Sequence, residues 1–172
     1  MSDRVKNGII NKMSEKPLGN QFERNEWILP TDINLVSLVQ DKFQQRLIEA
    51  GWGKDESINL AVGFSEALIN AIVHGNLEIK DKPENESWRE AALKKQTSVP
   101  SQKSIHVNLN ISSSGVAVVI KDEGEGFDWK KLNLSEVSLG SSGRGAMFMS
   151  GYYDSMKYNE KGNQVTLIKN KI

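Results

Sequence analysis

Apolar residues recur along the chain at two periods, and the shorter period marks the segments expected to form strands. Residues 105–111 alternate apolar and polar side chains, and a Ser-Ser-Ser-Gly turn separates them from the apolar run 116–120, so a hairpin is predicted. Residues 155–158 and 164–169 predict a second hairpin, with a Glu-Lys-Gly-Asn turn between them. Residues 27–30 predict a short strand that ends at a proline.

The longer period, with apolar residues three or four positions apart, predicts helices. Thr31 or Asp32 caps a helix that is expected to end near Ala50. Glycines then break the pattern, and a second, more apolar helix is expected over about residues 55–76. A shorter helix is predicted around residues 88–93.

The order of the predicted elements indicates the fold class. Helices come first and strands follow, with one more helix over residues 146–153 between the two hairpins. This order is typical of an α+β two-layer sandwich, with helices on one face of a mixed, mainly antiparallel sheet. Residues 1–25 are polar and aperiodic and predict a flexible N-terminal arm. Residues 26–172 predict a single domain, with an insertion at the polar residues 77–103.

The composition excludes several classes of protein. The 22 Lys and Arg residues balance the 22 Asp and Glu residues, so no net field draws the 172-residue chain to nucleic acid or membrane. There is no cysteine, which excludes disulfides and thiolate metal sites. No apolar run reaches the roughly 20 residues of a membrane helix, and the N-terminus lacks the apolar core of a signal peptide. A cytoplasmic location is expected.

The helix predicted over residues 55–76 carries a first group of polar residues on an apolar support. At about 100° per residue, four polar side chains fall in one narrow sector, namely Asn59, Glu66, Asn70 and His74. One interpretation is the solvated edge of an amphipathic helix, although such an edge usually carries more Lys and Arg. The other is a site, because an amide oxygen is a ligand for Mg²⁺ and a carboxylate can take a proton from a hydroxyl.

A second group follows the apolar strand 116–120. It contains Asp122, Gly124 and Gly126. An ordinary acidic turn is one interpretation. In the other, alternate glycines let the backbone approach a flat ligand, and the aspartate accepts a hydrogen bond from an exocyclic amine such as that of adenine.

A third group is the glycine- and serine-rich stretch 140–145, directly before the helix predicted over residues 146–153. One interpretation is a flexible linker. The other is a phosphate cradle, because glycines expose backbone N–H groups and a helix N-terminus favours an anion. The stretch lacks the Gly-Lys-Ser/Thr of a Walker A loop.

In this order, the three groups resemble the N, G1 and G2 boxes of the GHKL ATPases, the superfamily of gyrase, heat-shock chaperone, histidine-kinase and mismatch-repair ATPases. The resemblance covers about residues 27–170 and implies the Bergerat ATP-binding fold. Within the superfamily, the stretches GFSEALINAIVHGN and YNEKGNQVTLIKNK resemble the anti-sigma-factor serine kinases of bacterial partner switching. An unrelated α+β protein with coincidental motifs is the alternative.

The resemblance implies a role for each matching position. Glu66 matches the catalytic base, Asn70 the Mg²⁺ ligand, and Asp122 the aspartate that accepts a hydrogen bond from the adenine amine. The residues implied in nucleotide binding are Asn70, Asp122, Gly124, Gly126, Gly143, Arg144 and Gly145. Residues 129–143 match the lid over the nucleotide. ATP and Mg²⁺ are the implied cofactors.

The implied function is that of an ATP-dependent serine-protein kinase that acts as an anti-sigma factor. Such a protein binds a sigma factor, phosphorylates an anti-anti-sigma antagonist, forms a homodimer, and contacts neither nucleic acid nor membrane directly. The alternative is an ATP-binding regulatory interaction module of the same fold without efficient phosphoryl transfer. Asn163 departs from the pattern, because many relatives have threonine there, near adenine. His74 does not lie in a phosphoacceptor helix, so a structural role at the helix end is expected.

Overall fold

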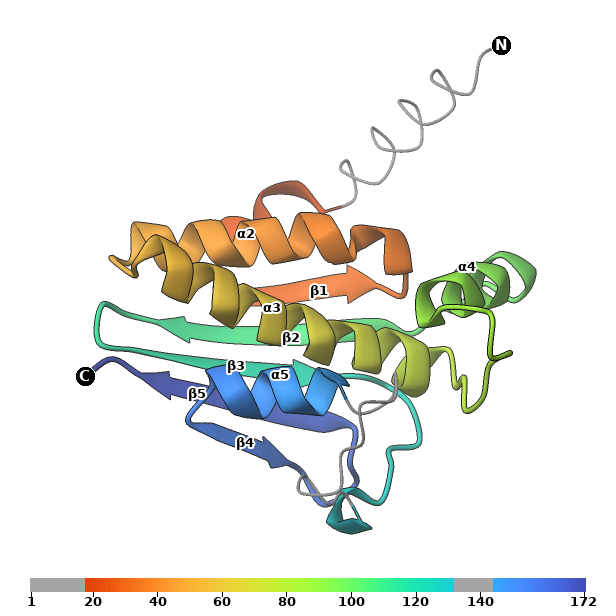
Figure 1. The fold of residues 1–172 in the computed structure, drawn as a ribbon. Helices are drawn as coiled ribbons and strands as arrows, with labels where there is room; N and C mark the ends of the chain where they lie inside the picture. The colour runs from red at the N-terminus through yellow and green to blue at the C-terminus, as the bar shows by residue number, and fades with distance from the viewer. Residues whose placement is uncertain (1–17, 132–143) are drawn as a thin grey trace.

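A five-stranded sheet forms one layer of the protein (Figure 1). The computed structural model describes residues 18–131 and 144–172. The strands are β1 (Glu26–Pro30), β2 (Ser104–Ile111), β3 (Gly115–Lys121), β4 (Ser155–Tyr158) and β5 (Gln164–Asn170), in the spatial order β1-β2-β3-β5-β4. Both predicted hairpins are confirmed, because β3 follows β2, β5 follows β4, and each pair is antiparallel. All strand pairs within the described residues are antiparallel.

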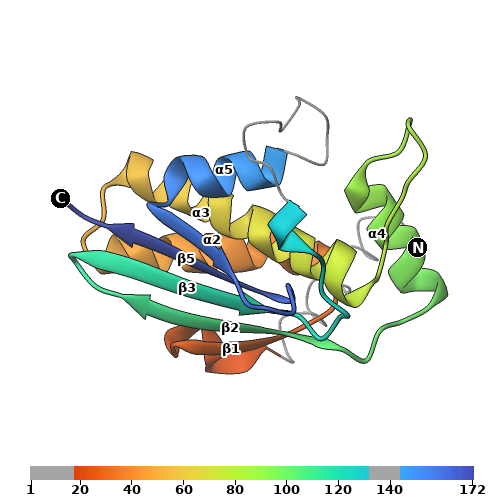
Figure 2. The same cartoon turned by 90° about the horizontal axis from the view of Figure 1, so that it is seen from below.

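The helices form the second layer. They are α2 (Val36–Glu49), α3 (Lys54–Asn70), α4 (Trp88–Ser98) and α5 (Arg144–Tyr152), and a π-helix, Ala71–Asn76, continues α3. Figure 2 shows α2, α3 and α5 together on one face of the sheet. The predicted two-layer α+β sandwich is therefore confirmed.

α3 lies between α2 and α5 and forms the centre of the core. Its Phe64 ring stacks on Phe43 of α2, with ring centroids 4.3 Å apart, and meets Trp27 of β1 edge-on. All three side chains are buried. Burying an aromatic side chain of this kind contributes about 1.5–3 kcal/mol, so these rings hold the helical layer on the sheet.

α5 is joined to α3 by a contact that depends on a glycine. The ring of Tyr153 lies against Gly63, where a β-carbon would come within 2.8 Å of the ring atom Cε2. The Tyr153 hydroxyl donates a hydrogen bond to the carbonyl oxygen of Leu60 at 2.7 Å. Burial raises the pKa of Tyr153 above its usual range, which keeps the hydroxyl protonated as this donor.

The continuous helix Lys54–Asn76 differs from one expectation drawn from the sequence. By length and composition alone it is apolar enough to cross a membrane. Most of it, however, is buried inside the domain, between the two neighbouring helices and the sheet. Its apolar character is therefore that of the central helix of this core.

Residues 18–25, which belong to the predicted N-terminal arm, pack on the domain. Leu18 is buried in the core, and the guanidinium of Arg46 in α2 donates to the carbonyl oxygen of Phe22 at 2.9 Å. These contacts come from another element, which a local polar pattern does not reveal. The rest of the predicted arm, residues 1–17, lies outside the described residues.

α4 confirms the helix predicted in the segment 77–103 and docks on the loop before α2. The Gln96 side chain accepts from the backbone N–H of Ile33 at 3.0 Å and donates to the carboxylate of Asp32 at 2.8 Å. The Asp32 carboxylate also accepts from the N–H of Asn34 and so caps the 3-10 helix Ile33–Leu35, which leads directly into α2. The N-cap position of α2 itself is Leu35, which makes no side-chain cap. The segment is thus tied to the start of the helical layer.

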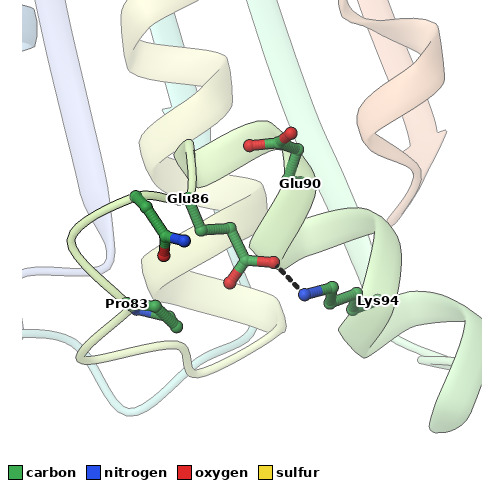
Figure 3. Close-up of a pocket in the computed structure, with 5 residues that line it drawn as sticks. Pro83, Glu86, Glu90 and Lys94 are labelled. Carbon is green, nitrogen blue, oxygen red and sulfur yellow. Dashed lines mark ion pairs between the residues drawn. The ribbon is translucent and has the colours of Figure 1, made fainter.

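A hollow of about 220 Å³ lies beside α4 (Figure 3). It is lined by Pro83, Asn85, Glu86, Glu90 and Lys94, and Glu86 forms an ion pair with Lys94. None of the predicted site residues lines this hollow. The site residues are instead gathered at the end of α3.

Candidate functional site

The structure brings three of the predicted site residues together where α3 meets α5. Glu66 and Asn70 are partly buried and lie one turn apart on α3. A β-carbon at Gly145 would lie 3.0 Å from Oε2 of Glu66 and 3.5 Å from Nδ2 of Asn70. The missing side chain at Gly145 therefore lets the first turn of α5 reach both polar groups.

The surroundings of Glu66 favour a proton acceptor. Partial burial raises the pKa of its carboxyl group above the usual value, which makes the carboxylate a stronger base than one in water. Arg144 and Gly145 open α5, whose N-terminal N–H groups carry partial positive charge. A carboxylate base thus lies beside a helix end suited to an anion such as phosphate.

The end of α3 departs from the regular helix that the sequence predicts. The backbone N–H of Leu77 donates to the carbonyl oxygen of Ile72 at 2.9 Å, the i→i−5 bond of a π-helix. Such turns are rare and are often found at functional sites. The wider turn means that the 100° spacing used to place His74 in line with Asn70 does not hold to the end of the helix.

His74 has the structural surroundings expected of a residue at a helix end. Its Nδ1 lies 2.8 Å from the carbonyl oxygen of Ile79, and because a carbonyl only accepts, Nδ1 carries the hydrogen. Its ring meets Trp88 of α4 edge-on, with centroids 4.6 Å apart. His74 therefore links the π-helix to the segment that contains α4.

Asp122 lies at the exit of β3 in a close-fitting backbone cradle. It is buried, and its Oδ1 accepts from the N–H of Gly124 at 2.8 Å. A β-carbon at Gly75 would lie 2.4 Å from Cγ of Asp122, and one at Gly124 would lie 2.4 Å from the carbonyl oxygen of Gly75. Two glycines thus allow the π-helix and the Asp122 loop to touch.

Burial raises the pKa of the Asp122 carboxyl group, and the hydrogen bond from Gly124 acts in the opposite direction. The effect of burial thus outweighs that of the hydrogen bonds that favour the charged carboxylate. A ligand that donates a hydrogen bond to this carboxylate would supply part of what burial removed.

Gly126 shapes the loop after Asp122 by contact with the β4–β5 turn. Gly126 and Gly162 both have φ of +80°, a conformation that favours glycine. A β-carbon at Gly126 would lie 2.0 Å from the carbonyl oxygen of Lys161, and one at Gly162 would lie 2.0 Å from that of Phe127. The two loops therefore pack backbone against backbone.

Asn163, which stands where threonine was expected, is engaged with Asp122 rather than open to a ligand. Its Nδ2 donates to the backbone carbonyl oxygen of Asp122 at 3.0 Å, and its backbone carbonyl oxygen accepts from the N–H of Asp122 at 2.9 Å. Its Oδ1 accepts from Nδ2 of Asn159 at 2.8 Å. The side chain thus fixes the backbone of Asp122.

Two residues of the site carry no predicted role. Gly75 is required by the approach of Asp122, and the buried Asn76 accepts from the N–H of Glu123 at 2.7 Å. The sequence signal was the His-Gly-Asn that ends the apolar helix, but Asp122 and Glu123, which Gly75 and Asn76 contact here, each lie 47 positions further along the chain. Gly143 and residues 132–142 of the predicted lid lie outside the described residues.

The residues present fit a magnesium ion held largely by the nucleotide. The amide of Asn70 lies beside Glu66, with its Nδ2 3.5 Å from a β-carbon built at Gly145. The oxygen of such an amide is an accepted ligand of Mg²⁺. In residues 18–131 and 144–172, no three His, Asp or Glu side chains form a metal-binding group. An ion bound at Asn70 would therefore take its other ligands from phosphate oxygens and water.

A comparison with protein families identifies the family of the chain. The family model of the histidine kinase-like ATPase domain matches residues 29–169. The chain belongs to this family, and so to the GHKL superfamily with its ATP-binding fold. No curated protein matches the chain significantly.

Proposed function

We propose that this ATPase-family protein is a serine-protein kinase that binds Mg-ATP and acts as an anti-sigma factor in partner switching. The observation that carries the proposal is the contact of Gly145 with both Glu66 and Asn70. It supports the proposal because Glu66 as the base, Asn70 as the metal ligand and the start of α5 as the phosphate site would then lie within one small volume. A binding module needs the last two of these but not a partly buried carboxylate beside them.

The proposed chemistry follows from these positions. The Glu66 carboxylate accepts the proton of a serine hydroxyl while the serine oxygen bonds to the γ-phosphorus. The bond from that phosphorus to the bridging oxygen breaks, and ADP leaves with the electron pair. Backbone N–H groups at the start of α5 stabilise charge on the transferred group. Mg²⁺, when bound, neutralises charge on the phosphate oxygens, and Asn70 would hold it.

The adenine base of the nucleotide is proposed to bind at the loop that contains Asp122. Oδ1 of Asp122 is occupied by the N–H of Gly124, so Oδ2 is assigned to the exocyclic amine of adenine. The partly uncompensated burial of this carboxylate supports a ligand donor at this position.

The partners are proposed from the resemblance of the two stretches that end at Asn76 and at Lys171. They are a sigma factor and a serine-containing antagonist, and the protein is proposed to be a cytoplasmic homodimer. A free antagonist releases the sigma factor from the kinase, and phosphorylation of the antagonist reverses that competition.

The test is incubation of the protein with ATP labelled at the γ-phosphate, Mg²⁺, and antagonist-like proteins encoded by the same genome. Transfer of label to a serine of one of them is expected. The matched control is Glu66→Gln, which keeps the shape of the side chain and removes the proton acceptor. ATP binding without labelling of any antagonist would favour the regulatory module instead.

A further inference from the structure

A buried carboxamide beside the nucleotide site joins four segments of the chain. Nδ2 of Asn76 donates to Oγ1 of Thr31 at 2.9 Å and to the carbonyl oxygen of Ser104 at 3.0 Å. Its Oδ1 accepts from the backbone N–H of Glu123 at 2.7 Å. Asn76 is 4 % exposed, so these three protein partners replace the water that its amide would otherwise bind.

The same junction closes the stem of the segment that contains α4. Thr31 donates its hydroxyl hydrogen to the carbonyl oxygen of Lys103 at 2.6 Å, and the Glu123 carboxylate accepts from the N–H of Ser104. Asn76 directly precedes residues 77–103, and Ser104 directly follows them. The two ends of the segment therefore meet at one amide.

The hydrogen bond between Asn76 and the N–H of Glu123 fixes the backbone directly after Asp122. Asn163 already holds the N–H and the carbonyl oxygen of Asp122 from the β5 side. The N–H of Gly124 then fixes one carboxylate oxygen of Asp122. The backbone of Glu123 lies between Asp122 and Gly124, and its N–H is held by the side chain of Asn76. This hydrogen bond therefore fixes the orientation of the loop next to the Asp122 carboxylate.

We propose that Asn76 is a positioning residue for adenine recognition, which aims the Asp122 carboxylate by holding the N–H of Glu123. The inference rests on the adenine role proposed for Asp122. It also gives the segment 77–103 a route to the nucleotide, because displacement of its stem at Ser104 acts on Asn76. A merely structural Asn76 would stabilise the fold without affecting which base is bound.

The test compares ADP with purine riboside 5′-diphosphate, which lacks the exocyclic amine, by calorimetry without metal. The dissociation constant of the purine riboside diphosphate divided by that of ADP measures the contribution of the amine. In Asp122→Asn this ratio is expected to fall about tenfold or more, the value of a hydrogen bond to a charged group. In Asn76→Ala it is expected to fall at least about threefold, because the carboxylate is present but no longer aimed.

Two further variants keep the test decisive. Leu47→Ala removes a fully buried side chain at the far end of α2, so it lowers stability without touching the junction, and its ratio should equal that of the wild type. If Asn76→Ala does not fold, Asn76→Ser keeps a polar group in the junction, but its hydroxyl is too short to hold Glu123.

The outcomes separate the two proposals. A wild-type ratio in the Asn76 variant together with a lowered ratio in Asp122→Asn overturns the positioning role and leaves the adenine site standing. A wild-type ratio in Asp122→Asn overturns the adenine site and, with it, the inference about Asn76. A fall in the ratio of Leu47→Ala equal to that of Asn76→Ala would show a general effect of stability and also overturn the positioning role.

Discussion

Gly145 lies so close to Glu66 that a β-carbon there would come within 3.0 Å of the carboxylate oxygen Oε2. The proposed base and the first turn of α5 therefore face the same small volume. In that volume a proton acceptor and a set of backbone N–H groups can act on neighbouring atoms of one substrate. Substitutions that affect only one of them should have different effects.

The Glu66→Gln variant should lose phosphoryl transfer but still bind Mg-ATP. The amide keeps the shape of the side chain but does not accept a proton, so phosphoryl transfer is expected to fall by about 10²–10⁴-fold. Mg-ATP affinity should stay near that of the wild type. The two quantities are measured by single-turnover transfer and by calorimetry. Equal transfer rates in the variant and the wild type would exclude Glu66 as the base.

Asn70→Ala should remove both transfer and the metal-dependent part of ATP affinity. The variant loses the amide oxygen proposed to hold Mg²⁺, whereas ADP without metal should bind much as before. ATP affinity is measured with and without Mg²⁺. If Asn70 were only a residue on a solvated helix edge, neither affinity would change and stability would move by less than about 0.5 kcal/mol.

Asp122→Asn should weaken ATP and ADP to the same extent, because both carry adenine. The loss of a charge-assisted hydrogen bond is expected to cost about 1.5–3 kcal/mol in binding free energy. Calorimetry with each nucleotide checks the prediction. Wild-type affinity for ADP in this variant would contradict the assignment of the adenine site.

Gly75→Ala should displace the Asp122 carboxylate, since the new β-carbon would lie 2.4 Å from Cγ. Overpacking of this kind is expected to cost about 1–3 kcal/mol in stability, with weaker nucleotide binding. Gly151→Ala is the matched control. Gly151 lies in α5 with no atom within 4 Å of a built β-carbon, so alanine there should stabilise by about 0.5–1 kcal/mol. Thermal unfolding and ADP binding of both variants give the comparison.

The raised pKa of Glu66 predicts how phosphoryl transfer and the stability of the fold each change with pH. Transfer should be lost as the pH falls through this pKa, at a higher pH than for an ordinary glutamate. A carboxyl group whose pKa is raised by folding contributes stability below its unfolded pKa and loses it as the pH rises through the folded pKa. Glu66→Gln should therefore unfold at a higher temperature than the wild type at neutral pH. That difference should shrink in acid.

Local patterns were enough to predict the strands and the α-helices of the fold. The alternation along β2 and β3 reflects one buried and one exposed face, and it predicts their hairpin without knowledge of the rest of the chain. Asp32 is an effective cap because its carboxylate reaches an N–H two residues away. Each of these features depends on near neighbours in the sequence.

The rest of the site depends on distant neighbours. Asn76 binds Thr31, 45 positions away, and Glu123, 47 positions away, so no local pattern could identify its partners. In the sequence Gly75 resembles an ordinary glycine at the end of a helix. Only the structure shows that Asp122 lies against it and leaves no room for a side chain. The π-helix is likewise a departure from the periodicity on which the prediction was based. Helical spacing was enough to group Glu66 with Asn70, but the joining of this pair with Gly145 followed from the family resemblance.

The contact of Tyr153 with Gly63 anchors the C-terminal end of α5 on α3. The hydroxyl and ring of Tyr153 hold the C-terminal end of the helix on α3, while Gly145 is near the opposite end. Eight residues of helix span about 12 Å, so a tilt of roughly ten degrees about Tyr153 moves Gly145 by about 2 Å. A change in the packing of Tyr153 on Gly63 would therefore alter the separation between Glu66 and the start of α5.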